Sequence, residues 1–266
     1  MKTLNSDVLL HQRDARGIHY WTLNDPSRYN VLSDEMLDQM ITASKLVAAD
    51  PTSRAVVIGA EGKAFCAGHD LKSMAAQTDI AAHQALFAKC SRMMLGLMQL
   101  PVPVIARVHA IATAAGCQLV AQADLAVAAE AAMFGVNGID IGLFCSTPSV
   151  ALTRNVGIKA AMEMLMTGDF IPAHEAKARG LVNRVCPAED LDAEVEQWVQ
   201  RLLSKPKEAI AMGKALVYQQ REAPMGAAYQ MAAQTMAVNM MHPVAQEGAQ
   251  AFVQKRKPDW NQGSSH

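Results

Sequence analysis

AVVIGAEGKAFCAGHDL, residues 55–71, combines an uninterrupted apolar run with a loop that ends in Gly68, His69 and Asp70. An apolar run as short as 55–59, bounded by turn residues, predicts a strand that is buried on both faces. Strands of this kind lie in parallel sheets that helices cover on each side. The stretch therefore predicts a strand at the centre of an α/β protein.

Working outward from this strand, short strands alternate with amphipathic helices, which is typical of α/β architecture. Ser33 is expected to cap a helix whose first turn carries Asp34 and Glu35. From residue 159 onward the pattern is almost wholly helical. We expect a core over residues 1–200 and a helical region over 201–266. Further strands are predicted at 8–10, 18–23, 104–108 and 125–128, and further helices at 79–99 and 116–122.

Composition narrows the class of protein. The chain has 266 residues, 51% of them hydrophobic, and a formal net charge of −1, so it lacks the basic surface that nucleic acid or an anionic membrane requires. No apolar run approaches the ~18 residues of a membrane span, and the N-terminus has no signal-peptide core. The five cysteines form no CxxC pair and the eight histidines show no ligand spacing, so no metal site is expected. These features predict a cytoplasmic protein with free thiols.

Several segments, taken together and in order, resemble the crotonase (enoyl-CoA hydratase/isomerase) superfamily. They are residues 62–71, 110–124, 133–143 with 176–185, and 252–257. The resemblance covers essentially the whole chain. It implies a core spiral of stacked ββα turns and a helical C-terminal region that mediates contacts in a homotrimer or a dimer of trimers.

The resemblance also implies a binding site for an acyl-CoA, with coenzyme A as part of the substrate and no separate cofactor. Enzymes of this family stabilise an enolate oxygen with two backbone N–H groups, one of them at the start of a helix. By position these donors are the amides of His69 and Ala115. The family's Gly-Gly-Gly is Ala114-Ala115-Gly116 here, which requires dihedral angles that accept a β-carbon. Arg28, Lys72 and Lys255 match positions that face the phosphates of coenzyme A, while Ala64 and Ala67 match those that receive adenine and pantetheine.

The sequence departs from the family where a hydratase carries two glutamates. Gln118 and Gly138 occupy those positions, and neither can act as a general acid or base. Losing one such group typically costs ~10²–10⁴ in rate. Replacing both residues with glutamate is expected to restore hydration, unless Gly138 has a positive φ that a side chain would strain.

Two nearby residues are alternative catalytic groups. Asp140 would share the face of Gly138 if this segment were extended, although it could equally be a helix cap or a surface acid. Ser146 could contact the acyl group, or Ser146 or Thr147 could cap a helix ahead of Pro148. A nucleophilic Cys145 would need a base, and the sequence offers none.

Three functions remain open from sequence. The chain could be an enzyme acting on an acyl-CoA, a non-catalytic acyl-CoA-binding protein, or a structural or regulatory partner that no longer binds coenzyme A. If catalysis survives, decarboxylation of a malonyl-type thioester or thioester hydrolysis fits best, because both depend mainly on stabilising an oxyanion.

Overall fold

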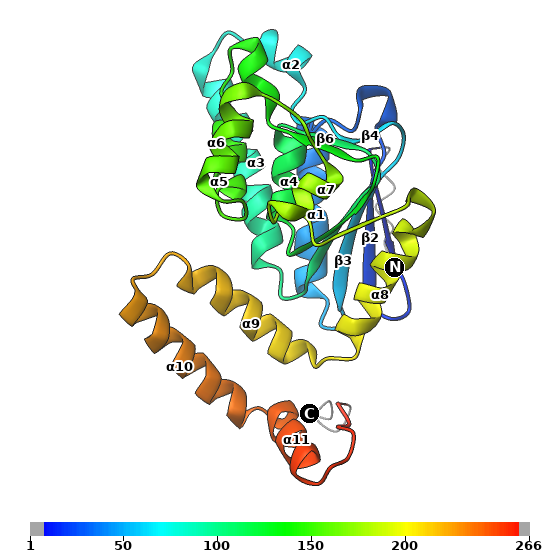
Figure 1. Ribbon diagram of the computed structural model, residues 1–266, viewed down its shortest axis with the longest axis vertical. Helices are drawn as coiled ribbons and strands as arrows, with labels where there is room; N and C mark the ends of the chain where they lie inside the picture. The colour runs from blue at the N-terminus through cyan, green and yellow to red at the C-terminus, as the bar shows by residue number, and fades with distance from the viewer. Residues whose placement is uncertain (1–7, 261–266) are drawn as a thin grey trace.

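The computed structural model describes residues 8–260 and contains two sheets (Figure 1). In the six-stranded sheet β2, β3, β5, β7 and β10 run parallel in that order, and β1 pairs with β2 in the antiparallel sense. Its strands are β1 Leu9–Arg13, β2 Ile18–Leu23, β3 Ala55–Ala60, β5 Val104–Val108, β7 Leu125–Ala129 and β10 Arg184–Cys186. The smaller sheet contains β4 Ala64–Cys66, β6 Ile111–Thr113, β8 Met133–Gly135 and β9 Ile171–Pro172.

Successive strands alternate between the two sheets, which gives the chain the form of a spiral. β3, β5 and β7 enter the larger sheet, and each is followed by a strand of the smaller sheet, β4, β6 and β8. Helices follow each of these pairs: α2 Leu71–Ala75 and α3 Ile80–Gln99, then α4 Ala115–Gln122, then α5 Ser146–Leu152 and α6 Ile158–Thr167. This arrangement is the expected α/β fold of stacked ββα turns. Because β4, β6 and β8 are parallel, the loops that follow them meet at one edge of the smaller sheet.

Helices cover both faces of the larger sheet, as the continuous apolar run of β3 predicts. Every residue of β3 is buried. On one face lies the main core with α1 Asp34–Ala49, whose first turn is capped by Ser33, its Oγ accepting from Met36 N at 3.2 Å. On the other face α8 Leu191–Leu203 packs Leu191, Val195 and Val199 against the sheet. The remaining helix of the core, α7 Ala173–Ala178, follows β9 and precedes β10 in the chain.

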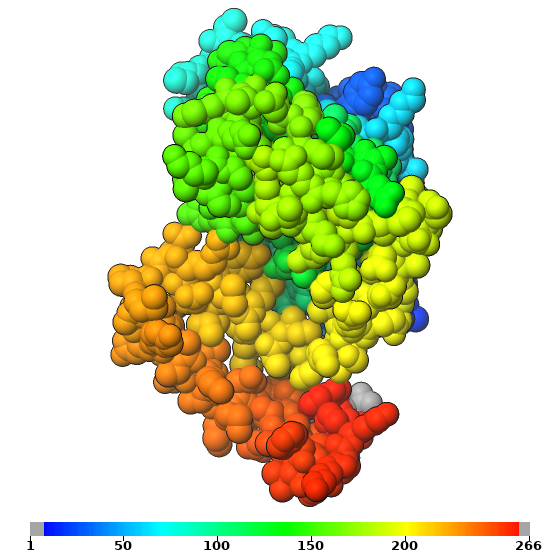
Figure 2. Space-filling model, viewed as in Figure 1, coloured from blue at the N-terminus to red at the C-terminus, as the bar shows by residue number. Residues whose placement is uncertain are grey.

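A helical lobe projects from this core (Figures 1 and 2). It contains α9 Lys207–Gln220, α10 Met225–Met241 and α11 Pro243–Val253. α9 is held to the core by Lys214, whose Nζ donates to Asp124 Oδ2 at 2.7 Å and to two main-chain carbonyls. Tyr218 donates to the other oxygen of Asp124 at 2.8 Å. The expected division at residue 200 falls inside α8, and it stays a prediction.

The turn into α4 is unusually tight because of a backbone contact with β4. A β-carbon on Gly116 would lie 2.1 Å from the carbonyl oxygen of Cys66, so only glycine fits there. Ala114, immediately before the helix, has φ 50° and ψ −120°, in a region that strongly favours glycine. Alanine in this segment requires dihedral angles that accept a β-carbon, and those of Ala114 do not. Its methyl group therefore strains the backbone by ~1–3 kcal/mol.

This strain predicts opposite effects for two alanine-to-glycine changes in the same region. Ala114→Gly should leave the free energy of unfolding unchanged or raise it by up to ~1 kcal/mol, because relief of strain offsets the added freedom of the unfolded chain. Ala121→Gly is the control, since Ala121 is a buried residue within α4 and glycine there should cost ~1 kcal/mol. Urea unfolding of both variants measures the difference. Equal losses would show that Ala114 is not strained.

Candidate functional site

The loops after β4, β6 and β8 surround a cavity of about 340 Å³. One of its walls is the short 3-10 helix η2 Asn137–Ile141 and the segment after it. Apolar side chains make most of the lining, chiefly Leu71, Met74, Phe87, Ile141, Leu143 and Phe144. A cavity of this size and polarity suits a small acyl group.

Two main-chain amides at this cavity, those of His69 and Ala115, donate to no acceptor within residues 8–260. Ala115 is the first residue of α4, where an N–H group has no partner inside the helix. The two segments touch, since a β-carbon on Gly68 would lie 3.0 Å from Ala115 N. Unpaired amides beside each other in an apolar cavity can both donate to one oxygen atom, and the α4 dipole favours negative charge there.

The side chain of His69 also lines the cavity, a feature that sequence reasoning missed because it considered only the amide. Its Nδ1 lies 3.4 Å from the Leu32 carbonyl oxygen, and its ring meets the ring of Phe87 edge-on at 5.5 Å. Its Nε2 is buried and has no partner in the described part of the chain. Burial lowers the pKa of His69, and the bond to Leu32 only partly opposes this effect. The imidazole is therefore neutral at neutral pH. The sequence did contain a signal for this side chain, because His69 lies in a loop with glycine, where a bulky polar residue is conspicuous.

The two positions of the hydratase glutamates differ in the space they offer. Gln118 is buried at 5% exposure, one turn along α4 from Ala115, and its Oε1 has no partner among the described residues. Gly138 donates its N–H to Cys145 Sγ at 3.3 Å, and a β-carbon there would lie 2.2 Å from the Leu143 carbonyl oxygen. A glutamate at 138 would therefore have to displace this backbone, which weighs against the expected restoration of hydration. The obstacle is this close backbone contact, since Gly138 does not have a positive φ.

For Asp140 and Ser146 the structure distinguishes between the alternatives that the sequence left open. The segment around Asp140 is a 3-10 helix and not extended, so Asp140 does not share the face of Gly138. Its carboxylate lies against Gly168, outside the lining of the cavity. Ser146 does line the cavity, but no side chain caps α5, because the Ser146 hydroxyl donates to the Phe144 carbonyl at 3.3 Å.

Among residues 8–260, none of those that line the cavity carries a carboxylate. Its titratable side chains are His69 and Cys145. Burial raises the pKa of the Cys145 thiol, so it stays protonated and is a poor nucleophile. Within residues 8–260 no three His, Cys, Asp or Glu side chains gather closely enough to hold a metal ion. None of the helices in this range is long and apolar enough to cross a membrane.

A further polar pair in the cavity, Thr113 and Asn137, was not found from sequence. Thr113 Oγ1 donates to Asn137 Oδ1 at 2.5 Å. This bond orients the carboxamide of Asn137, and its Nδ2 donates to no acceptor within the described residues. The cavity therefore offers a neutral donor in addition to the two amides. No spacing signal marks such a pair, because β6 and η2 bring it together.

The residues expected to bind coenzyme A are partly brought together. Ala67 lines the cavity, whereas Ala64 is buried in β4 with its carbonyl accepting from Asn30 Nδ2 at 2.9 Å. Lys72 is exposed on α2. Lys255 directly follows α11, at the opposite end of the molecule from α2 (Figure 1). Within one chain Lys255 is thus remote from the cavity.

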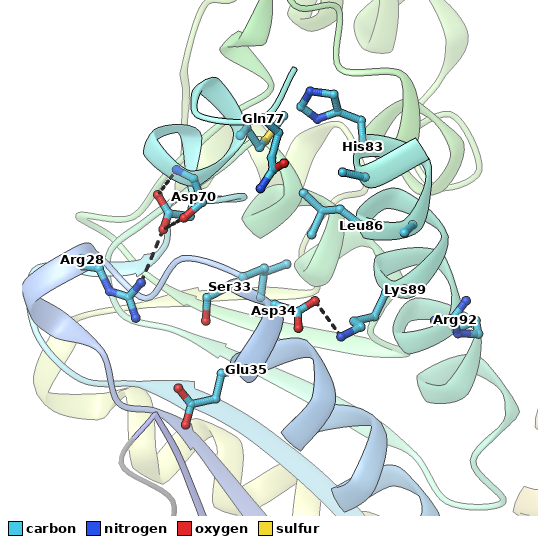
Figure 3. Close-up of a pocket in the computed structure, with 15 residues that line it drawn as sticks. Arg28, Ser33, Asp34, Glu35, Asp70, Gln77, His83, Leu86, Lys89 and Arg92 are labelled. Atoms are coloured by element: carbon cyan, nitrogen blue, oxygen red, sulfur yellow. Dashed lines mark hydrogen bonds and ion pairs between the residues drawn. The ribbon is translucent and has the colours of Figure 1, made fainter. Parts of the chain in front are cut away.

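Arg28 lines a second, wider pocket of about 700 Å³ that shares Met74 with the cavity. It is ion-paired with Asp25 at 2.6 Å. It also pairs with Asp70 at 3.4 Å (Figure 3). On the other side of this pocket Lys89 pairs with Asp34 at 2.6 Å. The charge of Arg28 is therefore already compensated by two carboxylates.

Comparisons with known proteins place this geometry in context. The sequence pattern of the enoyl-CoA hydratase/isomerase family matches residues 13–263. The enoyl-CoA hydratase domain-containing protein 3 of Xenopus laevis is 41% identical over 248 residues, which cover 93% of this chain and 84% of that protein.

Two solved structures are similar over nearly their whole length. The crystal structure of a Mycobacterium smegmatis enoyl-CoA hydratase has 55% identity and a TM-score of 0.94, covering 96% of this chain and 99% of that one. Human enoyl-CoA hydratase domain-containing protein 3 has 40% identity and a TM-score of 0.91, covering 95% and 100%.

These relatives correct the expected compartment. The Xenopus laevis, mouse and human proteins of this type are named as mitochondrial, which contradicts the prediction of a cytoplasmic protein. The prediction rested on free thiols and on a missing secretory signal, and neither distinguishes one reducing compartment from another.

The matched family pattern, the close relatives and the shared fold lead to one conclusion: the chain belongs to the enoyl-CoA hydratase/isomerase family of the crotonase superfamily.

Proposed function

We propose that the cavity binds the acyl part of a CoA thioester and stabilises its enolate, with the thioester oxygen held between the amides of His69 and Ala115. The observation that carries this proposal is the pair of unpaired amides in an apolar cavity without a carboxylate. Negative charge that develops on the thioester oxygen would meet donors already in position, at the positive end of α4.

The missing carboxylates favour a reaction in which the substrate itself supplies the electron pair. In a malonyl-type thioester, the bond between Cα and the carboxylate breaks, CO₂ leaves, and the electron pair moves to the thioester oxygen as an enolate. Cα then takes up a proton. The apolar lining disfavours the localised charge of the carboxylate, while the two amides favour the enolate oxygen. Nδ2 of Asn137 is free to orient the carboxylate before it leaves.

The coenzyme A moiety would leave the cavity past Ala67 toward Lys72. Because Lys255 lies at the far end of the same chain, its contact with a phosphate requires a neighbouring copy in an oligomer. Arg28, paired with Asp25 and Asp70, is better placed to fix the loop at the cavity than to bind a phosphate alone.

A non-catalytic acyl-CoA-binding protein is the second candidate. It is favoured by the same lack of carboxylates, since binding requires the amides and the apolar lining but no group that transfers a proton. Thioester hydrolysis is a third reaction to test, although within the described lining only His69 could activate a water molecule.

The proposal predicts which CoA thioesters are bound and turned over. We expect calorimetry to detect binding of acetyl-CoA and malonyl-CoA, and mass spectrometry to detect conversion of malonyl-CoA or methylmalonyl-CoA to the decarboxylated thioester. Crotonyl-CoA should bind and remain unhydrated, because the acid–base pair for hydration is absent.

Each alternative has its own result in this panel. Binding without any product identifies an acyl-CoA-binding protein, and free coenzyme A identifies a thioesterase. No binding at millimolar ligand removes coenzyme A from the function. Rapid hydration of crotonyl-CoA would contradict the decarboxylase proposal outright.

We also propose that copies of the chain associate through the helical lobe, as a homotrimer or a dimer of trimers. α10 and α11 expose large apolar side chains that a lone chain would leave in water. Six of them are more than 70% exposed: Met225, Tyr229, Met236, Met241, Phe252 and Val253.

Sedimentation equilibrium should give three or six times the chain mass of 28.6 kDa. A double change, Met241→Glu with Phe252→Glu, should lower the mass, because two charges cannot be buried unpaired at an interface. Ile80→Glu is the control, since Ile80 is equally exposed at 72% but belongs to α3 of the core. A parent protein that sediments as a monomer at micromolar concentration would contradict this assembly.

A further inference from the structure

We propose that the imidazole of His69 carries the proton to and from Cα of the bound thioester. A single residue would then act twice, through its amide on the thioester oxygen and through Nε2 on Cα. This inference rests on the thioester site proposed above. It adds the acid–base group that the missing glutamates would otherwise have provided.

The hydrogen bonding of the ring fixes which nitrogen is available. The Leu32 carbonyl can only accept, so Nδ1 of His69 carries the hydrogen in the neutral ring and Nε2 carries the lone pair. The two nitrogens point to different sides of the ring, so Nε2 is directed away from Leu32. It is buried without a partner in the described residues, at a ring that lines the cavity. A buried polar atom without a partner calls for an explanation, and a catalytic role is one of those that such atoms have.

No other lining group can take this role. Cys145 is held as a thiol that accepts from Gly138 N, and Asp140 lies outside the lining. Gln118 cannot exchange a proton near neutral pH. Histidine is the side chain whose ordinary pKa is closest to neutral, so a modest change in its surroundings switches its charge.

The neighbouring titratable groups, Asp70 and His83, do not contact the ring of His69. The Asp70 carboxylate accepts from the N–H groups that begin α2 and pairs with Arg28. His83 lies behind Phe87, with their rings stacked at 6.5 Å. Burial is the main influence on His69 and lowers its pKa, which keeps Nε2 unprotonated at neutral pH. An enolate formed in contact with the ring adds a negative charge that favours the imidazolium.

The proton transfer balances in both directions. After decarboxylation the imidazolium, protonated from water, gives its Nε2 proton to Cα, and the ring returns to neutral. In the reverse direction Nε2 removes a proton from Cα of acetyl-CoA, which leaves the enolate on the two amides. In D₂O the ring then returns a deuteron, so the thioester gains mass without net reaction.

Exchange of the Cα protons of acetyl-CoA in D₂O, followed by mass spectrometry, tests this role directly. His69→Asn keeps the main-chain N–H and places an amide donor near the Leu32 carbonyl, but it removes Nε2. Exchange should slow by ~10²–10⁴-fold while acetyl-CoA still binds by calorimetry. His83→Asn is the matched control, one ring farther from the cavity, and should exchange at the parent rate.

The pH dependence separates a proton carrier from a structural residue. In the parent, the rate of exchange should rise with pH and level off once Nε2 is unprotonated. Because burial lowers the pKa of His69, the bend in this profile should lie below the ordinary histidine pKa of 6.5. In His69→Asn the bend should be absent. If His69→Asn fails to fold or to bind, the bend in the parent alone decides the matter.

The failures of the two proposals are distinguishable. Exchange that depends on His69 without decarboxylation would refute the proposed reaction and leave this inference standing. Decarboxylation at the parent rate in His69→Asn, with exchange unchanged or never detected, would overturn this inference alone. A parent profile without a bend below pH 6.5 would overturn it as well.

Discussion

The contact between Gly116 and the carbonyl of Cys66 is the constraint on which the rest of the site depends. With no room for a β-carbon, α4 approaches β4 backbone to backbone. The first amide of α4 is thereby fixed beside the loop that carries His69. A side chain at 116 would push the helix away and separate the two amides. The tight entry also forces Ala114 into a glycine-like conformation, so the geometry is kept at a cost in local strain.

Since the donors belong to the backbone, they survive changes of side chain that would destroy a side-chain site. Gln118 and Gly138 stand where the resemblance implies the glutamates of a hydratase, whereas the amides of His69 and Ala115, our proposed donors, do not depend on side chains. In our proposal the cavity favours a developing oxyanion, and its lining, among the residues that the structure describes, contains no carboxylate to activate water. The neutral imidazole that lines this cavity belongs to His69, the residue that also provides one of the two amides. A scaffold of this kind can lose one reaction and retain the ability to stabilise the intermediate that several reactions share.

Much of the fold could be predicted from local sequence. The apolar run at 55–59 is the buried strand β3, Ser33 is the cap of α1, and the helix expected at 79–99 is α3. These features depend on periodicity and on caps, which a single segment determines. The order of an α/β core followed by helices has the same basis.

The details of the site could not be predicted, because they depend on neighbours distant in sequence. The lack of space at Gly138 comes from the Leu143 carbonyl, and the free Nε2 of His69 is defined by Leu32. The place of Asp140 depended on whether its segment is extended, and the segment is a 3-10 helix, which has a different periodicity from a strand. The remoteness of Lys255 depends on the direction in which the helical lobe leaves the core.

The stretching frequency of the thioester carbonyl in bound acetyl-CoA, measured by isotope-edited infrared spectroscopy, tests the central claim most directly. Two amides that donate to this oxygen weaken the C=O bond, so the band should move to lower frequency on binding. The shift should shrink in Ala115→Pro, which lacks one N–H at a helix position that accepts proline. It should persist in Ile158→Pro, the same change at the first residue of α6. A band that stays at its solution frequency in a bound, folded parent protein would contradict the account.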